Sequence, residues 1–456
     1  MGGEWQEKPL GKVFDLVNGY AFKSKDFSSS GVPVIKIKNV KAGYFSEHNF
    51  SYVSPDFLSV RHEKLAQRDD LLISMSGNRH DGSPETWVGK VAHFKRNEPF
   101  FINQRVGALR AKNTKDVCPR FMSYVLSSWD FQHLFISIAT SSGGQANISP
   151  KQILGTSVPV PHITEQRAIA HILGSLDDKV ELNRQMNRTL EQMAQALFKS
   201  WFIDFDPVVY NTVQAGHPVP ERFRVIAERY RQNPEIQTLP QHILDLFPNH
   251  FEDSDLGEIP AGWEAMNVGA KFDVIMGQSP PGQSYNEIGQ GLPFFQGRRD
   301  FGFRYPTQRV YCTEPKRLAN PGDTLISVRA PVGDINMARV KCCIGRGVAA
   351  VRHKSESRSF TYYSMRALTE QFSSYEGEGT VFGSINKKQF GKLPHVAPDD
   401  DLIDLFESLV GSSDGEIEAH IDEADSLSRI RDTLLPKLIS GQLRIPDAEN
   451  LLEQAV

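Results

Sequence analysis

The residues best suited to chemistry in this 456-residue chain are basic and aromatic side chains. The densest patch is "GRRDFGFRYPTQR" at residues 297–309, in which aromatic residues alternate with Arg298, Arg299, Arg304 and Arg309. Arginine can fork onto guanine O6 and N7 or clamp a phosphate. The patch therefore predicts a nucleic-acid contact. A solvated basic hairpin whose aromatic side chains face the core is the alternative.

Three stretches in the first half of the chain could play the same role. "IKIKNVK" is predicted to put Lys36 and Lys38 on one face of a strand, with Lys41 beyond it, although a solvated strand face fits equally well. The loop "MSGNRHDGSPETW" carries three residues that can read base edges, namely Asn78, Arg79 and His80. Ordinary variation of a surface loop is equally plausible there. The polar, glycine-rich "SSGGQAN" at 141–147 could approach DNA or a partner closely, or merely turn the chain.

Signatures of catalysis are missing from the sequence. "GNRHDGS" at 77–83 has the glycine spacing of a phosphate-binding loop but lacks its lysine, and there is no H-E-x-x-H motif. The N/D-P-P-F/Y tetrapeptide of amino-methyltransferases is also absent. Asp204 and Asp206 form a possible carboxylate pair, but capping or packing at a helix end suits them better. The four cysteines form no C-x-x-C pair and are predicted to be free thiols in a reducing cytoplasm. We expect neither catalysis nor a metal site.

Charge alternates along the chain although the net charge is only −4. Residues 1–160 hold 20 Lys and Arg against 14 Asp and Glu, and residues 258–398 hold 18 against 12. Residues 161–257 and 399–456 are acidic, with 9 against 14 and 4 against 15. Two locally basic blocks can bind phosphate while the whole chain stays acidic.

The two basic blocks repeat one another. "FDLVNG" at 14–19 returns as "FDVIMG" at 272–277, "DLLISM" at 70–75 as "DTLISV" at 323–328, and "RVGALR" at 105–110 as "GVAAVR" at 347–352. The offset falls from 258 to 237 in steps, and the largest loss lies in the loop that carries Asn78. Loops vary while the framework stays, so the sequence predicts two related domains. Duplication that only stabilises a symmetric fold is the alternative.

Each block is followed by a long helix with apolar residues three and four apart. The stripe of the first helix, at 164–202, is Ile169, Ile172, Leu173, Leu176, Val180, Met186, Leu190, Met193, Leu197 and Trp201. Eight of the ten positions stay apolar 237 residues later. We predict that both helices are packing elements and that they pair in antiparallel fashion.

The predicted fold class is α+β, with two similar mixed α/β domains separated by two long antiparallel coiled-coil helices in a pseudo-two-fold repeat. The predicted boundaries are 1–160 for the first domain, 161–205 for the first helix, 206–257 for a connector, 258–398 for the second domain and 399–444 for the second helix. The N-terminus has no signal-peptide pattern, and no apolar run approaches the length of about 20 residues that a membrane helix needs. A cytoplasmic protein is expected.

Four stretches resemble the specificity subunit of type I restriction–modification systems: "ALFKSWFIDFDPV" at 196–208, "LPQHILDLFPNHFEDSDLGEIPAGWE" at 239–264, "GSINKKQF" at 383–390 and "LLPKLISGQL" at 434–443. The resemblance covers essentially the whole chain, although the first block lacks the full "LGEIPAGWE" lead. It implies two target recognition domains, each of which reads half of a split double-stranded DNA sequence, and two conserved spacer helices.

The resemblance also implies partners. A non-catalytic specificity subunit binds two methyltransferase subunits that methylate adenine, and two motor–nuclease subunits complete the restriction enzyme. S-adenosylmethionine, ATP and Mg are then expected in the partner subunits and no cofactor in this one. A methylation-only system stays open, as does a coiled-coil scaffold without a DNA role, which the basic blocks argue against.

Two apolar clusters at the helix ends are predicted to dock the methyltransferase subunits. They are Phe198, Trp201 and Phe202 on the first helix and Leu434, Leu435 and Leu438 on the second. Large aromatic side chains at a helix end often anchor an interface. The alternative is that both clusters only close the intramolecular seam or cap the neighbouring block.

Overall fold

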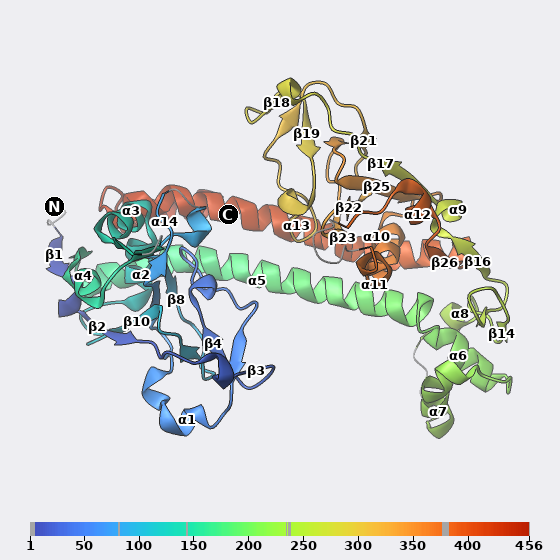
Figure 1. The fold of residues 1–456 in the computed structure, drawn as a ribbon, viewed down its shortest axis with the longest axis horizontal. Coiled ribbons are helices and arrows are strands. Elements are labelled where there is room, and N and C mark those ends of the chain that lie inside the picture. The colour runs from blue at the N-terminus through green and yellow to red at the C-terminus, as the bar shows by residue number, and fades with distance from the viewer. Residues whose placement is uncertain are drawn as a thin grey trace. The chain divides into compact units, whose positions relative to one another are not determined.

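The computed structural model describes residues 5–80, 83–142, 145–233, 235, 239–375 and 383–455. The chain forms two compact units, one of residues Met1–Asn183 with Asp422–Val456 and one of Arg184–Ile421. Each unit combines a β-rich domain with parts of two 40-residue helices, α5 (Ile163–Phe202) and α13 (Asp400–Ile439), which are labelled in Figure 1.

The domain of the first unit has an antiparallel main sheet in the order β2–β10–β6–β8 and a second sheet in the order β3–β5–β4–β9. Short runs of Val, Ile and Leu broken by Gly, Pro and Asn produce these strands. The strands are β1 (Gln6–Pro9), β2 (Phe14–Asn18), β3 (Phe27–Ser28), β4 (Val32–Ile35), β5 (Ser51–Val53), β6 (Leu71–Ser74), β7 (Ser76–Gly77), β8 (Val91–His93), β9 (Phe101–Ile102), β10 (Val106–Ala111), β11 (Thr140–Ser142), β12 (Gln145–Asn147) and β13 (Ser157–Val160). The helices are α1 (Phe57–Val60), α2 (Pro119–Ser127), α3 (Trp129–Ile138) and α4 (Pro150–Gly155).

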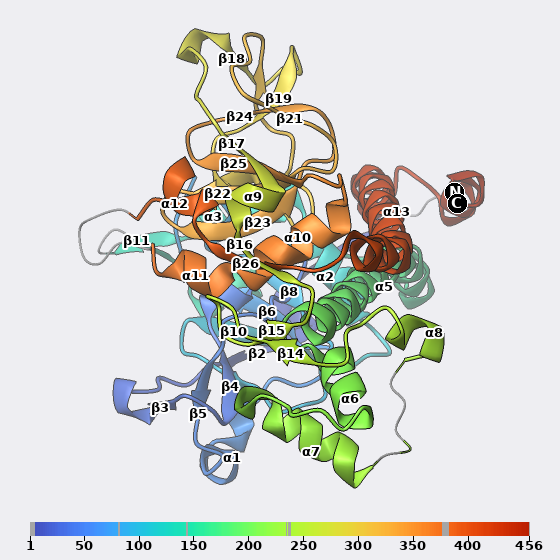
Figure 2. The same ribbon diagram turned by 90° about the vertical axis from the view of Figure 1, so that its right-hand side faces the viewer.

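The domain of the second unit repeats this topology, with a main sheet in the order β17–β25–β22–β23 and a second sheet in the order β18–β20–β19–β24–β21. Helix α10 packs between the main sheet and α13, and the second sheet extends away from the helices (Figures 1 and 2). The strands are β16 (Glu264–Asn267), β17 (Phe272–Met276), β18 (Tyr285–Asn286), β19 (Leu292–Phe295), β20 (Tyr311–Cys312), β21 (Leu318–Ala319), β22 (Thr324–Val328), β23 (Val332–Met337), β24 (Cys342–Ile344), β25 (Val348–His353) and β26 (Pro394–Ala397). The helices are α9 (Val268–Lys271), α10 (Arg358–Ala367), α11 (Thr369–Ser373) and α12 (Lys387–Gly391).

The repeated sequence motifs occupy equivalent places for physical reasons. Arg110 donates to both carboxylate oxygens of Asp70 at 2.8 and 2.9 Å in the first domain. In the second domain, two nitrogens of Arg352 contact one oxygen of Asp323, Oδ1, at 2.6 and 2.7 Å. The glycines that close "FDLVNG" and "FDVIMG" allow a close backbone approach. A Cβ there would lie 2.1 Å from a carbonyl oxygen, of Asn103 in one domain and of Gly345 in the other. The predicted similarity of the two domains is confirmed.

Helices α5 and α13 pair in antiparallel fashion, as predicted. In the first unit, Arg431 contacts Asp177 at 2.7 Å and Asn183 contacts Glu423 at 2.7 Å. In the second unit, Asn187 contacts His420 at 2.9 Å, and the rings of Phe198 and Phe406 are 5.5 Å apart. Residue numbers thus rise on one helix while they fall on the other.

The predicted apolar stripe of α5 is only partly correct. Its first five members, from Ile169 to Val180, are buried, as is Trp201. Between them the buried face consists of Asn183, Asn187, Glu191, Ala194 and Phe198. Met186 and Met193 are 40% and 64% exposed, and Leu190 and Leu197 are half-buried. The helix therefore turns a polar stripe inward and leaves an apolar stripe on its surface in the second unit.

The connector contains three helices, α6 (Asp206–Gln214), α7 (Arg224–Gln232) and α8 (Gln241–Leu244). Its strand β14 (Phe251–Glu252) pairs with β15 (Ile259–Pro260), which lies just beyond it. In the second unit, the apolar residues of the connector join the core that surrounds the end of α5. In the first unit, α14 (Ile445–Ala455) follows α13 and buries Ala448 against the domain core.

Candidate nucleic-acid interface

One edge of each main sheet gathers loops that are far apart in the sequence, through the same three backbone hydrogen bonds. In the first unit they run from the N–H groups of Asn103, Met75 and Ile148 to the carbonyl groups of Ile35, Arg105 and Met75, at 3.0, 2.9 and 3.0 Å. In the second unit they run from the N–H groups of Gly345, Val328 and Ile385 to the carbonyl groups of Phe295, Gly347 and Val328, at 2.9, 2.9 and 3.1 Å. The framework therefore builds one edge twice.

We call these surfaces loop edge 1 and loop edge 2. Loop edge 1 comprises residues 19–24, 36–39, 75–80, 103–105 and 145–151. Loop edge 2 comprises residues 277–283, 296–299, 329–333, 345–347 and 383–388. Each set contains six basic residues and no Asp or Glu, the basic residues being Lys23, Lys36, Lys38, Arg79, Arg105 and Lys151 in the first and Arg298, Arg299, Arg329, Arg346, Lys387 and Lys388 in the second. Such a concentration of positive charge favours an anionic partner.

Lys36 and Lys38 belong to loop edge 1, but the predicted strand is wrong there. Strand β4 ends at Ile35, and residues Ile37–Asn39 form a 3₁₀ turn. The side chain of Asn39 causes the turn, because its Oδ1 accepts a hydrogen bond from the Lys36 N–H at 3.0 Å. Lys36 is tied to Ser51 at 2.8 Å and lies over the ring of Phe27, and partial burial lowers its pKa. Lys38 is exposed.

Lys41 and the loop that carries Asn78, Arg79 and His80 lie nearby. Lys41 forms an ion pair with Glu85 of this loop at 2.9 Å. Asn78 is exposed but donates to the hydroxyl of Thr86 at 3.0 Å, and Arg79 donates to the carbonyl of Ala139. His80 stacks on His133, with ring centres 4.5 Å apart. These side chains hold the loop in place, which leaves fewer of them free to contact DNA than the sequence suggests.

The structure joins this loop to the "SSGGQAN" stretch, which the sequence presents separately. Strand β12 pairs with β7 on one side and with β11 on the other in a three-stranded sheet, in which Ser76 donates to Asn147 at 2.6 Å. Gln145 accepts a hydrogen bond from Arg105 at 2.8 Å. Gly143 and Gly144 lie outside the described residues, as do Asp81 and Gly82 of the loop.

The arginines of the patch at 297–309 differ in exposure and in whether they already form ion pairs. Arg298 is 56% exposed and pairs with Asp334 at 2.9 Å, and Arg299 is exposed. Both lie in the 3₁₀ turn Arg298–Asp300, which is equivalent to the turn after β4. Arg309 is 42% exposed and pairs with Asp300 at 3.1 Å. Arg298 and Arg299 therefore remain the better candidates for DNA contact.

Arg304 is not available to DNA, so its predicted role is wrong. Its side chain is 1% exposed, with Asp414 at 3.1 Å and Glu191 at 3.4 Å. It also donates to the Tyr363 hydroxyl at 2.9 Å and lies 4.1 Å from the ring centre of Tyr362. Burial alone would lower the pKa of Arg304, but the neighbouring acidic groups raise it above its ordinary value. Arg304 fastens the second domain to α5 and α13.

The two clusters predicted to dock partners are instead largely buried in the cores of the chain itself. Phe198, Trp201 and Phe202 are 4%, 1% and 5% exposed, within a core that includes Phe360 and Phe406. Leu434 and Leu438 are 5% and 0% exposed, and Leu435 is partly buried against the core of the first unit. The alternative raised from the sequence, closure of the intramolecular seam, describes these residues. These residues lie on the buried faces of the two helices. The sequence does not show which face is buried, because that depends on where the other helix packs.

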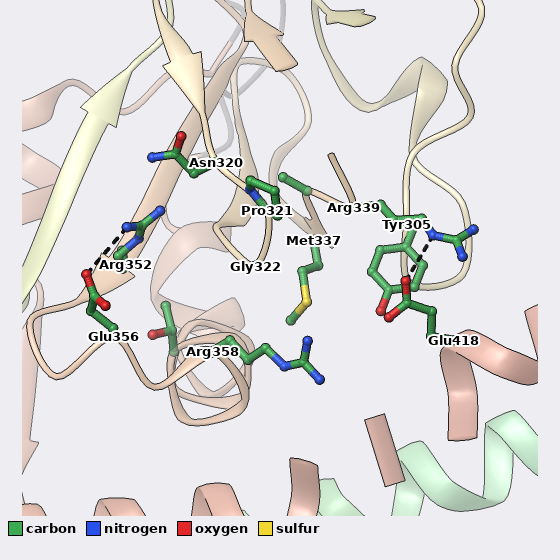
Figure 3. A pocket seen from close by; sticks show the side chains of 12 residues that line it. Tyr305, Asn320, Pro321, Gly322, Met337, Arg339, Arg352, Glu356, Arg358 and Glu418 are labelled. Carbon is green, nitrogen blue, oxygen red and sulfur yellow. Dashed lines mark hydrogen bonds and ion pairs between the residues drawn. The ribbon is translucent and has the colours of Figure 1, made fainter. Parts of the chain in front are cut away.

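A pocket of about 340 Å³ lies in the second unit (Figure 3). It is lined by three arginines and two glutamates, among them Arg339, which pairs with Glu418 at 3.1 Å, and Arg352, which pairs with Glu356 at 3.8 Å. These opposite charges offset one another, so the pocket is a weak site for a charged ligand. In the described part of the chain, no cluster of three or more His, Cys, Asp and Glu is placed to hold a metal ion. Nor does any helix there have the length and apolar character to cross a membrane.

Comparisons with known proteins agree with this architecture. The family model "Type I restriction modification DNA specificity domain" matches residues 2–192. The putative MjaX specificity subunit of Methanocaldococcus jannaschii is 26% identical over 454 residues, which cover 97% of this chain and 94% of that one. The HindI specificity subunit of Haemophilus influenzae is 28% identical over 361 residues, or 73% and 79% of the two chains. The crystal structure of a type I specificity subunit from M. genitalium has a TM-score of 0.54 at 15% identity, with 96% of each chain covered, so the two share a fold.

The chain is thus similar, over nearly its whole length, to proteins named as specificity subunits of type I restriction–modification systems.

Proposed function

We propose that this subunit recognises an asymmetric, bipartite double-stranded DNA target, with one half-site read by the domain at 1–160 and the other by the domain at 258–398. The observation that carries the proposal is the duplicated loop edge. The same backbone hydrogen bonds build both edges, while the side chains on them differ, as two readers of different sequences require.

In the same proposal, the subunit is a scaffold for two methyltransferase subunits and two motor–nuclease subunits in the cytoplasm. S-adenosylmethionine, ATP and Mg act in those partners. The surface that best suits a partner helix is the apolar stripe of α5 in the second unit, Met186, Leu190, Met193 and Leu197. Exposed apolar residues at helical spacing fit against the apolar face of another helix.

Mapping methylated adenines tests the proposal. The chain and its methyltransferase are expressed in a host that lacks other adenine methylation, and modified positions are read across the genome. The expected result is one motif made of two short specific parts with a fixed unspecified gap. A single continuous motif, or no sequence preference, would contradict the proposal that the target is bipartite. Cleavage of unmodified DNA after addition of the motor–nuclease subunit separates a restriction system from a methylation-only one.

A further inference from the structure

Two arginines that lie apart from the arginine-rich stretch occupy the centre of loop edge 2. Arg346 lies on the turn between β24 and β25, and Arg329 directly follows β22. The Val328 N–H donates to the Gly347 carbonyl at 2.9 Å, so the two segments are hydrogen-bonded neighbours. Both side chains are exposed, and within the described residues neither makes a side-chain hydrogen bond or ion pair.

The backbone on both sides of these arginines is held firmly. Arg346 stands between two glycines, and a Cβ at Gly347 would lie 2.4 Å from the Gln296 carbonyl oxygen. The 296–297 segment thus packs against the 345–347 turn. Because the other two residues of this turn are glycines, Arg346 is the one residue of the turn whose side chain projects. On the other side, the Ala330 N–H donates to the Gly383 carbonyl at 3.0 Å. A charged group on a fixed backbone loses less entropy on binding than one on a mobile loop.

The charge around these two arginines is mostly positive. Arg298 and Arg299 follow Gly297, which lies 3.5 Å from the Cβ position of Gly347. Lys387 and Lys388 follow the segment that pairs with Val328. Asp334 borders this surface but already pairs with Arg298. Among the residues that the structure describes, neither Arg329 nor Arg346 forms an ion pair with an acidic side chain, in contrast to Arg304 and Arg309.

We propose that Arg329 and Arg346 together form a DNA clamp at the centre of the second recognition surface, through guanine edges or phosphate oxygens of the half-site that this domain reads. Both groups accept the paired N–H donors of a guanidinium. The inference rests on the proposed function and assigns residues to it.

The test compares two variants in the complete methyltransferase complex, with fluorescent duplexes that carry either the mapped target or a scrambled second half-site. One is Arg329→Ala with Arg346→Ala. The matched control is Lys341→Ala with Lys354→Ala, which also removes two exposed positive charges but at the ends of β24 and β25 opposite to Arg346. Affinity is measured at several salt concentrations, and circular dichroism checks that each variant is folded.

The double variant is expected to bind the target at least tenfold more weakly than the control, because one base-reading arginine alone is worth about 5- to 150-fold. If the contacts are to phosphate, the slope of log affinity against log salt becomes shallower by about 0.9 for each contact, and Arg346→Lys retains most of the binding. If they are to guanine, discrimination against the scrambled half-site falls and the lysine variant does not restore it.

Equal affinity and equal salt slope in the double variant and the control would overturn the clamp while leaving the proposed function intact, provided that the unaltered complex prefers its target. A complex that shows no preference for the mapped target would overturn the proposed function together with the clamp.

Discussion

Whether an arginine of this chain is a buried anchor or a free surface charge depends on the acidic groups that the fold places beside it. Arg304 and Arg299 lie five positions apart, yet one is sealed among Glu191, Asp414 and two tyrosines while the other faces solvent. A buried guanidinium needs paired acceptors, because removal of its hydration is costly. Burial with two carboxylates therefore makes Arg304 an anchor.

Replacement of Arg304 should destabilise the second unit. Arg304→Met leaves Asp414 and Glu191 buried with less counter-charge, so we expect a loss of about 3–5 kcal/mol in the free energy of unfolding. Arg299→Met, an exposed change in the same stretch, should stay within about 0.5 kcal/mol of the unaltered chain. Urea unfolding followed by tryptophan fluorescence measures both. Similar midpoints for the two variants would show that the buried ion pairs contribute little.

At the scale of elements, α5 divides its apolar residues between two tasks. Trp201 and Phe198 complete the core of the second unit, and the inward face before them is polar, with Asn187 and Glu191 in contact with other parts of the unit. Met186 and Met193 face outward instead. A helix that buries polar residues and exposes methionines is well suited to bind a further helix, because methionine adapts to irregular surfaces.

Substitutions on the two faces of α5 should therefore have opposite effects. Met186→Ser with Met193→Ser should leave the melting temperature nearly unchanged but weaken methyltransferase binding, which light scattering would detect as a complex that lacks a subunit. Trp201→Ala should cost about 3–5 kcal/mol of stability, because it empties a buried site. Gln195→Ser, an exposed change elsewhere on the helix, serves as the control. A normal complex formed by the methionine variant would exclude this stripe as the docking surface.

At the scale of the whole molecule, each β-rich domain carries its own ion pair across the main sheet and its own loop edge. Such a domain should keep its specificity when it is moved. A hybrid in which residues 1–160 come from a relative should methylate a motif with one new and one original half, read by genome-wide methylation mapping. The reciprocal exchange of 258–398 should change the other half. A hybrid that keeps both original halves would show that the half-sites are not read separately.

The sequence alone was sufficient for the repeat, the α+β class and the two long helices. Those features rest on local periodicity and on short motifs such as "FDLVNG", whose glycine and strand residues act within their own segment. Asp70 and Arg110 belong to motifs that recur in the sequence, although the ion pair between them joins residues 40 positions apart.

Only the tertiary structure decided which side chains are free. From the sequence, Lys36 is predicted to lie in a strand, but the side chain of Asn39 forms a turn there instead. Arg304 is predicted to lie on the surface, but the fold buries it beside Asp414, which is 110 positions later in the chain. The heptad stripe of α5 predicts the wrong inward face near Asn187, because the inward face depends on what α13 and the domain offer to it. Arg329 and Arg346 attract no notice in the sequence and come together only when β22 and the β24–β25 turn pair. Burial and charge pairing depend on contacts between distant segments, which local pattern cannot specify.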